Sequence, residues 1–150
     1  MAWTDSRIFR QLFADILDNT AAIDIVTDAS VKAALYNNSI TPDRDVAAAS
    51  SAYNTGVWAN TNEVSDGAEW AAGGVNIAGR AITTPSTGVV MFDGNDTASG
   101  TSATLASVFG CLVYDDTIAA PVADQGICFN YFGGTNSVTD GTFTVVWHAN

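Results

Sequence analysis

Paired carboxylates are the first feature of this sequence that could support a reaction. Glu63 and Glu69 are the only glutamates of the chain, and both lie in the stretch NEVSDGAEWAAGG, residues 62–74. Two carboxylates that face each other across a cleft are the catalytic groups of a glycosidase. Nothing in this stretch fixes the two glutamates against each other, and it contains no histidine or cysteine. We therefore expect surface or turn roles for both glutamates.

Few other residues offer nucleophilic or metal chemistry. His148 is the only histidine and lies third from the C-terminus. A zinc site or a Ser-His-Asp triad needs partners that this position does not supply, and no Cys-x-x-Cys motif is present. Cys111 and Cys128 lie in strand-like runs, where we expect buried thiols, with their pairing left open. We predict no catalytic residue, no cofactor and no metal.

Two acidic clusters resemble fragments of a calcium site. DGND offers Asp93, Asn95 and Asp96, and PDRD offers Asp43 and Asp45. Calcium takes six or more oxygen ligands, which neither cluster supplies alone. Asn and Asp side chains also bind their own backbone in Asx turns, which explains both clusters more simply. Whether Asp93 and Asp96 hold a cation stays open.

The composition is typical of proteins that pack against neighbouring proteins, and also of some secreted β-proteins. The 150 residues suit a single domain, 1–150, and they are 47% apolar but only 14% charged, with a net charge of −11. Five basic residues give little attraction to nucleic acid or an anionic membrane, so neither is an expected partner. A surface with few ionic groups loses little hydration on burial. The sequence lacks a membrane-spanning apolar run and a signal-peptide pattern at its start, which predicts synthesis and assembly in a cytoplasm.

Hydrophobic periodicity predicts one helix followed by many strands. On a helical wheel of residues 5–19, one half carries Ile8, Phe9, Leu12, Phe13, Ile16 and Leu17. The rest of the chain, 22–148, alternates short strand-like runs with turns rich in Gly, Asn and Asp. The predicted strands are 22–28, 31–37, 75–82, 89–93, 102–116, 125–132 and 142–147, with a turn over 133–141. We expect a mainly β fold: an antiparallel β-sandwich or partly closed barrel with an N-terminal amphipathic helix.

The charges of the predicted helix oppose its dipole. Arg7 and Arg10 lie near the positive end and Asp15 and Asp18 near the negative end, and each placement costs a few tenths of a kcal/mol. All four lie on the wheel's polar half, so a solvated face explains them. Alternatively, the two arginines meet carboxylates on another subunit or a partner.

The tryptophans separate into core and contact candidates. Trp3, Trp58, Trp70 and Trp147 are the four of the chain, and most large aromatics of a small β domain belong to its core. Trp58 and Trp70 fall in irregular segments and are the best candidates for surface contact. For residues 62–74 we expect an architectural role, with positive φ at Gly67, a bend at Gly73–Gly74 and a buried Trp70 ring. A contact loop is the alternative.

The order of several segments resembles a group of tailed-bacteriophage virion proteins. A strand with Lys-x-Ala-Leu-Tyr is followed by Thr-Pro-Asp, by Asn-Glu-Val, and by a Gly-x-x-Trp-x-x-Gly-Gly stretch formed by Gly67, Trp70, Gly73 and Gly74. The runs VFGCLVYDDT, ADQGICFNYFGG and GTFTVVW are similar to the closing strands of that group, so the resemblance spans residues 8–147.

The resemblance implies a decoration or minor capsid protein that binds the outer head lattice and reinforces it by non-covalent contacts. Its expected partners are the major capsid protein and further copies of the chain, and its expected location is the surface of the virion capsid. No catalytic residue belongs to the pattern, so no enzyme activity is expected. From the weakly charged surface and the opposed helix charges we select, as interface residues, Trp3, Arg7, Arg10, Trp58 and Trp70.

Two other functions stay open. A tail-tip or fibre module would bind host surface glycan through an exposed cluster of Trp or Tyr rings. A secreted carbohydrate-binding domain is a third possibility, which the absence of a signal-peptide pattern disfavours.

Overall fold

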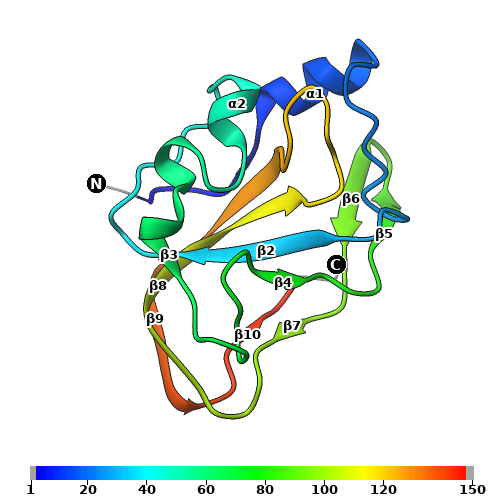
Figure 1. Cartoon of the computed structure of the whole chain (residues 1–150). Coiled ribbons are helices and arrows are strands. Elements are labelled where there is room, and N and C mark those ends of the chain that lie inside the picture. The colour runs from blue at the N-terminus through cyan, green and yellow to red at the C-terminus, as the bar shows by residue number, and fades with distance from the viewer. Residues whose placement is uncertain (1–2, 148–150) are drawn as a thin grey trace.

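A six-stranded antiparallel sheet forms the centre of the computed structural model, which describes residues 3–147. The strands follow the order β1–β9–β8–β2–β3, and β4 also pairs with β2. Their bounds are Arg7–Ile8 (β1), Val31–Tyr36 (β2), Glu63–Val64 (β3), Val75–Asn76 (β4), Ala103–Asp115 (β8) and Gly126–Gly141 (β9). The long strands β8 and β9 run side by side through the molecule (Figure 1).

Two small sheets and short helices surround this central sheet. The hairpin of β5 (Ala81–Ser86) and β6 (Val89–Asp93) forms one, and β7 (Thr97–Ala98) with β10 (Thr144–Val145) forms the other. The helices are α1 (Arg10–Leu17) and α2 (Ala48–Ser51), followed by the 3₁₀ turns Gly56–Trp58 and Asn60–Asn62. Figure 1 shows α1 and α2 at one end of the central sheet and β7 and β10 at the other.

Aromatic packing around Trp58 organises the core. The Trp58 side chain is fully buried, and its ring lies 5.2 Å from Tyr36, 5.8 Å from Trp3, 5.9 Å from Phe129 and 6.1 Å from Phe9, measured between centroids. The Tyr36 hydroxyl donates a hydrogen bond to the Trp58 carbonyl at 2.5 Å. The contacts with Tyr36, Trp3 and Phe9 are edge-to-face, a geometry that stabilises aromatic pairs by about 0.5–1.5 kcal/mol beyond area burial. The irregular segment that carries Trp58 is therefore fixed onto the sheet.

The predicted fold class is confirmed in its coarse form. The structure is mainly β, and every strand pair in residues 3–147 is antiparallel. The partly closed barrel is wrong, because β1 and the β3–β4 side remain the two separate edges of the central sheet.

The predicted N-terminal amphipathic helix over 5–19 is not confirmed. Helix α1 covers only eight residues, because Arg7 and Ile8 pair with Phe129 and Cys128 of β9 and are therefore extended. Of the six apolar side chains on the expected buried face, only Phe9 and Leu12 are buried. The helix instead buries a residue of the expected polar face, Asp15.

Two further local predictions are wrong for identifiable reasons. Residues 22–28 form a turn rather than a strand, because the Asp24 carboxylate accepts hydrogen bonds from the Val26 and Thr27 amides at 3.1 Å each. Residues 133–141 continue β9 rather than turning. Gly133 and Gly134 have φ of 78° and 158°, and the polar residues after them pair with β8 in shifted register.

Candidate interaction surface

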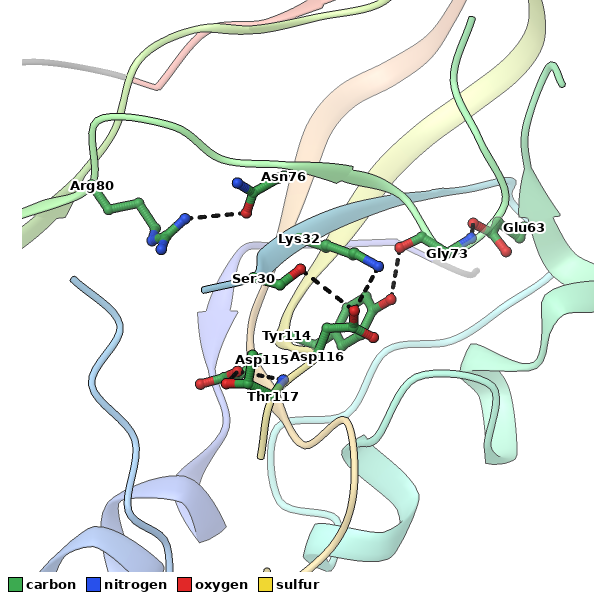
Figure 2. A network of polar contacts seen from close by, with 10 residues as sticks. All are labelled: Ser30, Lys32, Glu63, Gly73, Asn76, Arg80, Tyr114, Asp115, Asp116 and Thr117. Carbon is green, nitrogen blue, oxygen red and sulfur yellow. Dashed lines mark hydrogen bonds and ion pairs between the residues drawn. The ribbon is translucent and has the colours of Figure 1, made fainter. Parts of the chain in front are cut away.

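The Glu63 carboxylate holds the segment 62–74 onto the rest of the protein. It accepts a hydrogen bond from the Tyr53 hydroxyl at 2.8 Å and one from the Gly73 amide at 2.7 Å, the second of which is drawn in Figure 2. Partial burial raises the pKa of Glu63, and both hydrogen bonds oppose that rise. Glu63 therefore has a structural role as the hydrogen-bond acceptor of the Tyr53 hydroxyl and the Gly73 amide.

The two glycines at the end of this segment permit its close approach to the sheet. The Tyr114 hydroxyl donates to the Gly73 carbonyl at 2.7 Å (Figure 2). The Tyr114 ring stacks on Tyr53, with 4.8 Å between the ring centroids. Gly74 has φ of 80°, and a Cβ atom there would lie 2.2 Å from the Ala33 carbonyl oxygen. Only glycine fits this position, and it lets β4 begin beside β2.

The middle of the segment is fixed to the start of β8. The Thr104 amide donates to Asp66 Oδ2 at 2.6 Å, and the Ser102 amide donates to Glu69 Oε2 at 3.2 Å. Trp70 is fully buried and packs edge-to-face on Phe143. The expected positive φ is present at Gly67, at 47°, so the architectural role predicted for this segment is confirmed. The two glutamates bind backbone groups in different places and do not form a catalytic pair.

The tryptophans selected as interface residues are core residues. Trp3, Trp58 and Trp70 have 5%, 0% and 0% of their surface exposed, so the prediction that Trp58 and Trp70 offer exposed rings is wrong. Trp58 lies in a 3₁₀ turn and Trp70 in an isolated β-bridge, and neither segment has regular strand patterning. Among residues 3–147 no exposed Trp or Tyr is found, because Tyr53, Tyr131 and Trp147 are themselves half-buried.

The arginines selected as interface residues are exposed and paired within the chain. Arg7 lies 2.9 Å from Asp5, and Arg10 lies 3.3 Å from Asp45. Exposed pairs of this kind contribute about 0–1 kcal/mol, so they leave both guanidinium groups available to a partner. Their role at an interface stays a prediction.

A polar cluster that includes the buried Asp115 closes the end of β8 (Figure 2). Lys32 of β2 forms an ion pair with Asp116 at 2.7 Å. The neighbouring Asp115 is fully buried, and its Oδ1 accepts hydrogen bonds from the Thr117 amide at 2.8 Å and hydroxyl at 2.6 Å, whereas Oδ2 has no hydrogen-bond partner. Burial is the main cause that raises the pKa of Asp115, and the adjacent Asp28 carboxyl raises it further.

Arg80 fastens the turn 22–28 to this end of the sheet. Its Nε donates to the Ile25 carbonyl at 2.8 Å, and one terminal nitrogen donates to the Asp28 carbonyl. The other terminal nitrogen donates to the Ile77 carbonyl at 2.5 Å and to Asn76 Oδ1 at 3.1 Å, the contact drawn in Figure 2. One planar guanidinium thus connects two segments that are more than 50 positions apart.

An apolar groove, which sequence reasoning missed, lies between α1, the turn 23–26 and the β5–β6 hairpin. Its volume is about 530 Å³. The residues that border it are Ile8, Leu12, Phe13, Ile16, Ile23, Asp24, Ile25, Val26, Ile82, Val90, Phe92, Ile127 and Cys128. We call this set, together with Leu17, which follows Ile16 at the end of α1, the apolar groove. Residues from four separate parts of the chain build it, so no local pattern reveals it.

The rim of the apolar groove is unusually exposed. Leu17 and Val90 are 84% and 73% exposed, and Ile8 and Phe13 are about half exposed. Asp24 is the only charged residue among the groove residues. Its carboxylate already accepts the Thr27 hydroxyl, which is the main cause that lowers the pKa of Asp24. Contiguous exposed apolar surface of this kind marks interaction sites on soluble proteins.

The other sequence candidates have structural roles where the structure describes them. Cys111 and Cys128 are free thiols, and burial raises the pKa of Cys128 to about 12. In DGND, the Gly94 amide donates to Asp93 and the Trp147 amide to Asp96; in PDRD, the Asp45 amide donates to Asp43. No group of three ligands for a metal occurs within residues 3–147. His148 lies outside the described residues.

Comparison with known proteins identifies no relative of this chain. No family model matches it, and neither a curated protein nor a solved structure matches it. In the part of the chain that the structure describes, no helix is long and apolar enough to cross a membrane. The groove geometry therefore carries the functional argument that follows.

Proposed function

We propose that this chain is a non-enzymatic structural protein of a tailed-bacteriophage particle, a decoration or minor capsid protein that binds the outer head lattice. The observation that carries the proposal is the exposed apolar groove on a chain with only 14% charged residues. Contiguous exposed apolar surface of this kind marks a site where another molecule binds. A protein that is assembled into a particle needs such a site.

The mechanism is burial of apolar surface, repeated over many copies. Each square ångström of apolar surface removed from water contributes about 25 cal/mol. The net charge of −11 keeps the free chain soluble before assembly and disfavours contact through its acidic surfaces. Ionic groups that stay at the hydrated rim of a contact avoid the cost of burial. Head reinforcement by such contacts needs no catalytic group.

We assign the contact with the major capsid protein to the side of the molecule that carries Arg7 and Arg10. Their pairs with Asp5 and Asp45 are exposed, so acidic groups of a partner can replace the internal ones at little cost. This side also contains a polar hollow bordered by Thr4, Asp5, Arg7, Pro42, Asp43, Arg44 and Phe129. Charges at the rim of an interface mainly steer association and set its register.

Binding to heads tests the proposal. Heads that lack this chain are incubated with the purified protein, and bound copies are located by cryo-electron microscopy. We expect ordered density on the outer lattice, with weaker binding by an Arg7→Glu, Arg10→Glu variant at low salt and a smaller difference at high salt. Absence of bound protein on heads, together with its capture by host envelope glycan, would replace the proposal with the tail-tip function.

A further inference from the structure

We propose that the apolar groove is an interface for a second copy of this chain, arranged about a two-fold axis. In this dimer the β5–β6 hairpin of one copy lies along α1 and the groove of the other. The proposal concerns the isolated protein and does not require a place in a phage particle.

The β5–β6 hairpin supports this dimer, because no third strand of the described residues pairs with it. In residues 3–147 its strands pair only with each other. Ile82, Val89 and Val90 are 46%, 45% and 73% exposed on it. A two-stranded hairpin alone is marginally stable in water and needs further strands or a packed face. A covering partner supplies that face.

The shape of the surface also supports this dimer. It combines a hollow, lined in part by the buried Leu12 and Ile127, with two highly exposed apolar side chains: Val90, which borders the hollow, and Leu17, which follows the bordering Ile16 in α1. A surface that offers both a hollow and exposed apolar side chains can be complementary to itself. Two-fold dimers join the same patch of both subunits, and they are the commonest form of soluble oligomer.

The near absence of charge in the groove favours a second copy of the chain over a charged partner. Two copies that each carry −11 repel each other wherever their acidic residues meet. The groove is the place where they can meet without that cost, because Asp24 alone is charged there and it is satisfied by its own turn. A basic partner would find no free carboxylate to pair with and would bury its own charges unpaired.

Sedimentation equilibrium over a range of protein concentrations tests this directly. We expect the wild type to show twice the monomer mass of 15.6 kDa. Val90→Asp and Leu17→Asp each place one carboxylate per copy in the interface and should raise the dimer dissociation constant about a hundredfold or more. The matched control is Val146→Asp, because Val146 is 69% exposed and lies outside the groove. It should leave the mass unchanged.

Several results would overturn the dimer. A monomeric wild type at every concentration, or a three-fold mass, contradicts the two-fold arrangement. So does a dimer that Val146→Asp dissociates while Val90→Asp and Leu17→Asp do not. Circular dichroism of each variant establishes that it is folded. A monomer that still decorates heads defeats this inference alone, whereas a dimer that never binds heads defeats the proposed function alone.

Discussion

Asp15 of α1 and Gln125, which precedes β9, form a buried hydrogen bond of 2.7 Å although they are 110 positions apart in sequence. The other carboxylate oxygen of Asp15 accepts the Gln11 side-chain amide at 2.8 Å. This contact fixes the rotation of α1 against the sheet. It turns the helix so that Phe13, Ile16 and Leu17 remain exposed beside the groove.

Replacement of Asp15 by alanine should lower the free energy of unfolding by about 1–3 kcal/mol, because the Gln125 amide then loses its acceptor inside the protein. Urea denaturation measures this loss. Asp18→Ala is the control, since Asp18 is exposed on the same helix and should change stability by no more than about 0.5 kcal/mol. Equal effects of the two substitutions would contradict the role assigned to Asp15.

Gly74→Ala should be among the most destabilising changes in the segment 62–74. It combines a positive φ with a clash against the Ala33 carbonyl, for a total of about 2–5 kcal/mol. Gly67→Ala separates the two causes, because Gly67 also has positive φ but a Cβ there has nothing within 4 Å. It should cost only the backbone strain of about 1–2 kcal/mol. Thermal or urea unfolding that ranks Gly67→Ala as the worse change would refute this explanation of Gly74.

Arg80→Lys should loosen the turn 22–28 while keeping the charge. Lysine cannot reach the Ile25, Ile77 and Asp28 carbonyls together, and the loss of these charged hydrogen bonds should cost about 2–4 kcal/mol. Hydrogen exchange should become faster in residues 23–28, whereas the amides of β8 and β9 should stay protected. Unchanged exchange in the turn would show that Arg80 does not hold it.

Asp115 makes the protein less stable as the pH rises. Its pKa in the folded state lies above the ordinary value of 3.8, so the folded state binds more protons than the unfolded state between those two values. The protonated Asp115 carboxyl therefore stabilises the folded state fully below the ordinary pKa of 3.8. This contribution is lost as the pH rises through the pKa that Asp115 has in the folded state. Asp115→Asn should remove this loss.

Stability curves of the wild type and the Asp115→Asn variant, measured by urea denaturation from pH 4 upward, check this. Asparagine keeps the acceptor for Thr117 and adds an amide donor in place of the unpartnered Oδ2. The variant should gain on the wild type as the pH rises. Asp140→Asn, at an exposed site, should follow the wild type, and a parallel curve for Asp115→Asn would exclude Asp115 as the source.

Sequence patterns predicted what depends on near neighbours. The alternation in residues 102–116 and 89–93 matches β8 and β6, and the glycines of 62–74 occupy the expected conformations. Those patterns could not predict contacts between residues that are distant in the sequence. The pairing of Arg7 and Ile8 with β9 shortened the helix, and burial of Asp15 against Gln125 rotated it.

The groove could not be predicted because its parts are unremarkable in isolation. The apolar residues of α1 suit a buried helix face, and those of β5–β6 suit a half-buried hairpin. Only the arrangement of four separate segments brings them together around one groove. The prediction that Trp58 and Trp70 are exposed was wrong for a related reason. Both lie in irregular segments, where burial produces no hydrophobic periodicity in the sequence.

Cryo-electron microscopy of the complete virion tests the central claim most directly, because that claim places this chain in a particle as a structural component. The account predicts density for the chain on the outer surface of the head, with the apolar groove covered by protein and the Arg7–Arg10 side against the lattice. A complete, infectious particle whose head contains no copy of this chain would contradict it.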